Sequence, residues 1–191
     1  MTTTTIARQA KESSIALAAT TLECRNQALL AIADGLRRHA DDIRAANDRD
    51  LAEAADLEPS LRKRLRFDDG KISDVISGLE ALAALPDPLG VLLTHTELAP
   101  GLELRRLSCP IGVIGVIFES RPDALVQISA LCLKSGNAVL LKGGREAINT
   151  NRALAGVIAS ATSGCGIPDG WISLLETRED VAQMLTLNDY I

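Results

Sequence analysis

Aromatic side chains are scarce in this sequence, which holds two phenylalanines, one tyrosine and one tryptophan among 191 residues. So few rings leave little surface on which unpaired nucleic-acid bases could stack. Positive charge is also in the minority, because 20 lysines and arginines stand against 25 aspartates and glutamates, for a net charge of −5. Together the two shortages argue against a general nucleic-acid-binding protein.

Long apolar runs are absent as well. No stretch approaches the roughly 20 apolar residues that a helix needs to cross a bilayer. The opening residues, MTTTTIARQAKESS, lack the apolar core of a secretory signal peptide. We therefore expect a cytoplasmic protein with no membrane segment. At 47% hydrophobic and 24% charged residues, the composition is ordinary for a globular domain, alone or with a packed helical extension.

Cysteine and histidine are too sparse and too scattered to suggest a metal site. No two of the four cysteines form a CxxC pair: Cys24, Cys109, Cys132 and Cys165. The histidines, His39 and His95, have no partners at ligand spacing. We expect no metal and no disulfide framework, and we interpret the cysteines as reduced, structural residues.

The stretch from Pro110 to Glu146 predicts a strand, a helix and a second strand. The run Ile111–Phe118 is apolar on both faces, which is typical of a parallel strand covered by helices. Pro122 suits the first turn of a helix, and Gly136-Asn137 is a strong stop signal. Four apolar residues between them repeat at helical spacing: Leu125, Ile128, Leu131 and Cys132. Residues 138–141 form the second strand, and a right-handed crossover is expected.

The residues before this unit predict a mainly helical N-terminal segment, 1–85. The expected elements, in order, are a disordered tip at Met1–Thr5, an amphipathic helix from Ile6, a longer helix with apolar positions from Leu22 to Ile43, a helix capped by Asn47-Asp48, a short helix opened by Pro59 and a helix capped by Asp68 or Asp69. Segment 86–110 then predicts a β-hairpin around Ala99-Pro100-Gly101, with a bulge at Arg105-Arg106.

Segment 111–191 continues the alternation of strand and helix. A helix is expected over 147–163, a third strand at Trp171–Leu175 and a further helix over Asp180–Leu187. The fold class is therefore α/β, with a helical N-terminal segment, a hairpin and, in segment 111–191, the start of a doubly wound parallel sheet.

Both strands of the central unit end in polar turns. Glu119, Ser120 and Arg121 follow the first strand, and the run Lys142 to Glu146 follows the second. Ligands of open α/β sheets bind at the carboxyl ends of strands, so both turns should border one crevice. Adjacent glycines let a phosphate or ribose approach the backbone, and lysine and arginine supply positive charge. A plain tight turn with solvated charges is an equally good interpretation, because neither GxGxxG nor the phosphate-loop pattern is present.

The stretch FESRPDALVQISALCLKSGNAVLLKGGREAINTNRAL, Phe118 to Leu154, resembles the gamma-glutamyl phosphate reductases, or glutamate-5-semialdehyde dehydrogenases, of the aldehyde dehydrogenase superfamily. The SRPD and LLKGG.E signatures are intact, and the match is long and ungapped. The resemblance implies an aldehyde-dehydrogenase-like fold, of which this chain would hold the N-terminal part. It also implies NADPH-dependent reduction of L-glutamate 5-phosphate to L-glutamate 5-semialdehyde and phosphate, in proline biosynthesis.

The same resemblance implies roles for the polar turns and for the hairpin. Lys142, Gly143 and Gly144 would approach the adenosine ribose of NADPH, and Arg145 would help to hold its 2′-phosphate. Glu146 would line the same site, but it follows Lys142 by four residues where the superfamily pattern Lys-x-x-Glu has three, so its role stays open. The hairpin would be an arm that pairs with a neighbouring subunit of a homo-oligomer, or else an ordinary hairpin closing the domain. A glutamate 5-kinase would be a partner.

The turn Glu119, Ser120, Arg121 and Pro122 would border the nicotinamide or the acyl-phosphate pocket. Arg121 either neutralises an anionic substrate group or forms an ion pair with Glu119 or Asp123 that fixes the turn.

No catalytic residue is expected in this chain. In the resembling family a cysteine thiolate attacks the acyl phosphate, and it lies in a second domain downstream of the stretch matching Asp189-Tyr190-Ile191. None of the four cysteines here sits in a matching motif, so the isolated chain should be inactive. Two alternatives stay open, a non-catalytic nucleotide-binding or interaction module and a general aldehyde dehydrogenase. Against the latter, Phe118–Pro122 stands where common aldehyde dehydrogenases have a Pro-Trp-Asn turn.

Overall fold

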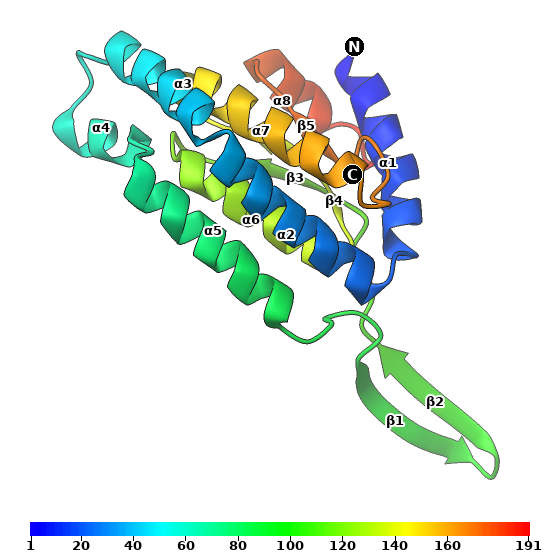
Figure 1. The fold of residues 1–191 in the computed structure, drawn as a ribbon. Coiled ribbons are helices and arrows are strands. Elements are labelled where there is room, and N and C mark those ends of the chain that lie inside the picture. The colour runs from blue at the N-terminus through cyan, green and yellow to red at the C-terminus, as the bar shows by residue number, and fades with distance from the viewer.

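The computed structural model describes residues 1–191 and shows a helical body from which a two-stranded ribbon projects (Figure 1). Five helices come first: α1 (Thr3–Ala18), α2 (Leu22–Arg38), α3 (Ala40–Glu53), α4 (Pro59–Leu65) and α5 (Asp69–Ala84). Side-chain caps start several of them, as at α5, where the Asp68 carboxylate accepts a hydrogen bond from the amide of Lys71 at 3.1 Å. No helix combines the length and apolarity needed to cross a bilayer.

Three expectations for the helical segment are wrong. The N-terminal tip is not disordered, because the Thr2 hydroxyl caps α1 and the Thr3 hydroxyl donates to Asp180 at 2.7 Å. The expected helix from Leu22 to Ile43 is two helices, because the backbone at His39 leaves helical geometry (φ −105°, ψ 19°). Asn47 consequently lies inside α3 and does not cap the start of a helix; its side-chain amide donates instead to the carbonyl of Leu65 at the end of α4, at 2.9 Å.

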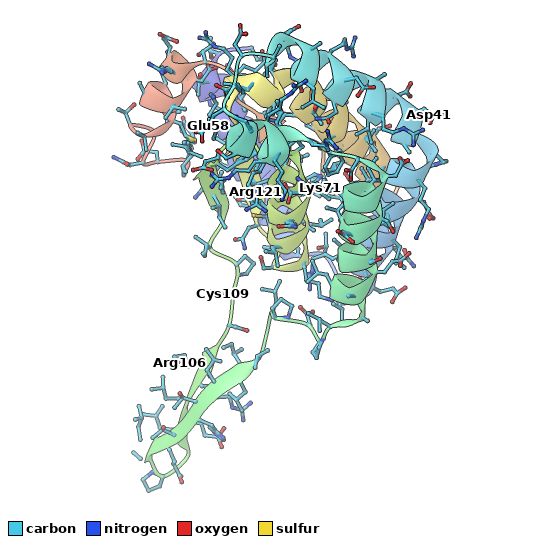
Figure 2. All side chains as sticks on the ribbon, turned by 90° about the vertical axis from the view of Figure 1, so that its left-hand side faces the viewer. Asp41, Glu58, Lys71, Arg106, Cys109 and Arg121 are labelled. Atoms are coloured by element: carbon cyan, nitrogen blue, oxygen red, sulfur yellow. The ribbon has the colours of Figure 1, made fainter.

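The projecting ribbon is the hairpin of β1 (Leu92–Ala99) and β2 (Leu102–Leu107), paired antiparallel. Every residue of both strands is exposed, and Figure 2 shows Arg106 and Cys109 well away from the helices. The register irregularities lie in β1, after Leu92 and after Glu97, rather than at Arg105-Arg106 in β2. The bulge was therefore expected on the wrong strand.

The remaining elements form a parallel α/β unit. They are β3 (Val113–Ile117), α6 (Pro122–Lys134), β4 (Ala138–Lys142), the 3-10 turn η1 (Arg145–Ala147), α7 (Ile148–Ser163), β5 (Ile172–Leu174) and α8 (Arg178–Met184). The strands are ordered β3-β4-β5, all parallel. Because both crossovers run in the same direction across the sheet, right-handed connections place α6 and α7 on one face. Helix α1 contacts all three strands from the other face and packs against α8.

Helices on both faces bury β4, whose first four residues are inaccessible. The expected full burial of the first strand is wrong, because β3 is an edge strand and Ile117 is 56% exposed. Leu131 of α6 is also exposed rather than buried, whereas Leu125 and Cys132 lie in the core as expected.

Candidate nucleotide cleft

A cleft of about 950 Å³ opens where the three parallel strands end. Its lining comes from all three strand ends: Ile117 and Phe118 at the end of β3, Lys142 to Glu146 and Ile148 from the end of β4 onward, and Glu176 to Glu179 and Val181 after β5. This volume lies in the range of small-molecule sites, and the position is the one at which open α/β sheets bind ligands.

All five residues expected to bind the cofactor line this cleft: Lys142, Gly143, Gly144, Arg145 and Glu146. Glu119 and Ser120 lie in an adjoining hollow of about 330 Å³, which shares Gly144 and Glu146 with the cleft. Arg121 lines neither cavity. Its guanidinium donates to Asp123 at 3.0 Å, beside Pro122 in the first turn of α6.

Close packing explains the two glycines between the cleft and the hollow. Gly144 has ordinary extended geometry (φ −60°, ψ 150°), and neither glycine has a positive φ. A Cβ atom on Gly143 would clash with Asn151 and Phe118, and one on Gly144 would clash with Ser120 and Glu146. The glycines therefore allow the turn after β4 to pack directly against the turn after β3.

The cleft presents more free positive than free negative charge. The Lys142 ammonium donates to the carbonyl of Gly143 at 2.6 Å, and the side chains of Arg145 and Arg178 make no hydrogen bond or ion pair within the protein. The Glu176 carboxylate is occupied by Arg152, whose Nε and Nη2 donate to it at 2.6 and 2.5 Å. Glu179, the remaining carboxylate of the lining, has no partner. An anionic ligand would therefore meet two unpaired guanidinium groups and one unpaired carboxylate.

Glu146 is hydrogen-bonded by Ser120 and still lines the cleft beside these cations. The Ser120 hydroxyl donates to Oε2 of Glu146 at 2.5 Å across the two strand-end turns. This hydrogen bond is the main reason that the pKa of Glu146 lies below its ordinary value, with a further contribution from its own backbone amide and smaller ones from Lys142 and Arg145. Glu146 is thus a carboxylate at neutral pH.

A buried polar network fixes the start of α7 beside the cleft. The Asp50 carboxylate of α3 accepts hydrogen bonds from the amides of Asn149 and Thr150 at 3.0 and 2.8 Å, and from the Thr150 hydroxyl at 2.5 Å. Asn47 donates to the same hydroxyl at 3.1 Å and accepts from the amide of Phe67 at 2.8 Å. Local sequence patterns do not predict this network, since an aspartate on one helix can cap another only through tertiary packing.

The cleft residues that follow β5 were likewise not predicted: Glu176, Thr177, Arg178, Glu179 and Val181. Their signal was available, because a third strand was expected to end at Leu175. Ligands of open α/β sheets bind at the carboxyl ends of the strands, and this rule applies to β5 as it does to β3 and β4.

Known proteins are similar to this chain in sequence and in fold. Residues 2–191 match the aldehyde dehydrogenase family, so the chain belongs to that family of nicotinamide-dinucleotide-dependent oxidoreductases. The chain is similar to the gamma-glutamyl phosphate reductase of Pelotomaculum thermopropionicum, with 56% identity over 97% of this chain and 43% of that protein. The family resemblance seen in the sequence is confirmed.

Two solved gamma-glutamyl phosphate reductases have the same fold. The structure from Thermotoga maritima matches with a TM-score of 0.96 and 33% identity, and the one from Saccharomyces cerevisiae with 0.93 and 38%. Each match covers 100% of this chain, but only 47% and 50% of the two solved chains. The α/β, aldehyde-dehydrogenase-like fold class is confirmed, and the chain spans about half the length of the relatives it matches.

Proposed function

We propose that a reductase containing this chain catalyses the NADPH-dependent reduction of L-glutamate 5-phosphate to L-glutamate 5-semialdehyde and phosphate, in cytoplasmic proline biosynthesis. The observation that carries this proposal is the 56% identity to a gamma-glutamyl phosphate reductase over nearly the whole chain. The turn Phe118–Pro122, with no Pro-Trp-Asn sequence, supports this reaction over that of a general aldehyde dehydrogenase.

In this proposal the chain supplies the cofactor cleft. Bound NADPH brings the hydride, and the chain has only to hold and orient it. Lys142 would hold the adenosine ribose, and Ile117, Phe118 and Val181, which line the same cleft, would offer apolar surface to the adenine. The residues present fit the cofactor, because the cleft is large enough for a small molecule and its lining includes three cations, Lys142, Arg145 and Arg178, that suit a phosphate.

The nucleophilic thiolate comes from outside these residues. None of the four cysteines lines the cleft. Burial raises the pKa of the Cys132 thiol to about 11 and also raises that of Cys165, so both are poor thiolates at neutral pH. Cys109 lies at the base of the hairpin, and the Cys24 thiol donates to the carbonyl of Cys165 at 3.0 Å.

The hairpin supports assembly into a homo-oligomer. Its apolar side chains have nothing to cover them within this chain, as at Leu98, which is 59% exposed, and Leu104, which is 52% exposed. A glutamate 5-kinase is the partner that would supply the acyl phosphate.

The decisive experiment assays phosphate-dependent reduction of NADP with glutamate 5-semialdehyde. A reductase containing this chain should turn over, and the purified 191-residue chain should not. Turnover by the isolated chain would make one of its own cysteines the nucleophile. No turnover by the longer protein, with full activity toward unrelated aldehydes and no phosphate requirement, would favour a general aldehyde dehydrogenase.

A further inference from the structure

The hydrogen bond between Ser120 and Glu146 joins the two turns that carry the expected cofactor and substrate residues. Ser120 follows β3, and Glu146 follows β4 within η1. A Cβ atom on residue 144 would lie 1.9 Å from the Ser120 hydroxyl oxygen and 2.8 Å from Oε2 of Glu146. Gly144 therefore leaves room for this hydrogen bond, and a larger residue there would displace the two side chains.

The direction in which Glu146 points matters for any dinucleotide in the cleft. In dinucleotide-binding sheets a carboxylate near the adenosine ribose accepts hydrogen bonds from the 2′-hydroxyl and so favours NAD. The same carboxylate repels the 2′-phosphate of NADP, for which a nearby guanidinium is needed instead. Glu146 is the acidic residue next to Lys142 in this cleft, so its orientation bears directly on the choice between the two cofactors.

The other charges of the cleft favour a phosphate once Glu146 is held aside. Arg145 and Arg178 approach from the ends of β4 and β5, and neither has a carboxylate partner. Two further carboxylates line the cleft near Arg178: Glu176, which is bound by Arg152, and Glu179, which has no partner. The cleft is left with more free cations than free carboxylates.

We infer that Ser120 is a positioning residue for cofactor selectivity: its hydroxyl holds the Glu146 carboxylate toward the adjoining hollow, so that Arg145 and Arg178 bind the 2′-phosphate of NADP. The inference rests on the proposed function, since it assumes that the cleft binds this dinucleotide. It gives Ser120 a role at the adenosine end, in place of a direct contact with the acyl phosphate.

Calorimetric titration of the 191-residue chain with NADP and with NAD at low ionic strength tests the inference, because the two ligands differ only in the 2′-phosphate. Ser120→Ala frees Glu146 to approach the ribose. We expect the affinity for NADP to fall about fivefold relative to that for NAD, as one like charge moved closer to the phosphate predicts. Ser120→Thr keeps the hydroxyl and should keep the wild-type ratio of the two affinities.

Glu146→Gln provides the matched background, because it removes the charge and keeps an acceptor for Ser120. Adding Ser120→Ala to Glu146→Gln should leave the ratio of the two affinities unchanged. If Ser120 only stabilised the turn, its loss would weaken both dinucleotides alike and would do so in either background. An unchanged ratio in Ser120→Ala overturns the inference alone, whereas a wild-type chain that binds neither dinucleotide overturns the proposed cofactor cleft as well.

Discussion

Lys142 is the cation closest to the backbone of the cleft. Its stem continues β4, and its ammonium lies 2.6 Å from the carbonyl of Gly143, which keeps the charge beside the two glycines. The lysine is half-buried, so its hydrogen bonds are less screened than those of a fully exposed side chain.

We expect Lys142→Ala to weaken NADPH binding about ten- to a hundredfold, because a hydrogen bond from a charged donor contributes roughly 1.5–3 kcal/mol. Fluorescence titration with NADPH measures the change. Lys63→Ala is the matched control, since it removes an equal charge from α4, outside the cleft. Equal affinities for the wild type and Lys142→Ala would remove Lys142 from the site.

At the scale of the element, α7 depends on a cap that its own sequence does not contain. The amides of Asn149 and Thr150 in its first turn, and the Thr150 hydroxyl, all donate to the buried Asp50 carboxylate. Without that acceptor these buried donors would have no partner, and an unpaired buried donor is costly.

Asp50→Ala should therefore lower the free energy of unfolding by about 2–4 kcal/mol, measured by urea denaturation. Asp48→Ala is the control, because Asp48 is exposed on the same helix and should change stability by less than about 0.5 kcal/mol. Similar losses in both variants would show that helix propensity matters here and that the cap does not.

Helix α8 begins with a capping box that should make stability depend on acid pH. Hydrogen bonds, chiefly from the amide of Thr177 and then from the Thr3 hydroxyl, lower the pKa of Asp180 from 3.8 to about 2. A depressed folded-state pKa stabilises the protein above the unfolded value, and this contribution is lost as the pH falls from about 4 toward 2.

After allowance for solvent screening, we expect the Asp180 contribution to be about 1 kcal/mol. Thermal unfolding at pH 5 and at pH 2.5 should show a smaller difference for Asp180→Asn than for the wild type. Asp169→Asn is the control, because the side chain of Asp169 makes no hydrogen bond. An unaltered pH response in Asp180→Asn would refute this role for the cap.

Local sequence signals predicted where helices start and end better than they predicted which residues are buried. Pro122, Asp68 and Gly136-Asn137 gave the starts of α6 and α5 and the end of α6, because proline geometry, side-chain caps and left-handed glycine act within one turn. The exposure of Ile117 was not predictable in this way, since it follows from β3 standing at the sheet edge. For the cleft, the strand-end rule found five lining residues, but the Ser120–Glu146 contact required the packed turns.

At the scale of the whole molecule, the hairpin is anchored to the helical body at both of its ends, although its strands are exposed. The segment that precedes β1 is fixed by hydrogen bonds. Arg25 donates to Asp87 at 2.7 Å, and the buried Lys134 donates to the carbonyl of Leu85 at 2.7 Å. The segment that follows β2 is fixed by Asn137, whose side-chain oxygen accepts hydrogen bonds from the amides of Ile111 and Gly112. A ribbon anchored in this way is ordered before it meets a partner, which lowers the entropic cost of association.

The last prediction concerns this ribbon as a pairing arm. Neighbouring residues of a strand point to opposite faces, so replacing Leu104 or Arg105 with serine, in separate variants, tests each face of β2 in turn. If the apolar face is buried by a second copy, Leu104→Ser should raise the dissociation constant of the oligomer about tenfold or more, because burial of a leucine contributes roughly 1.5–3 kcal/mol. Arg105→Ser, which removes only an exposed ion pair with Glu103, should leave the constant nearly unchanged. Sedimentation velocity across a concentration series measures both variants. A wild-type chain that stays monomeric throughout, or equal effects of the two replacements, would show that the hairpin does not pair through this face.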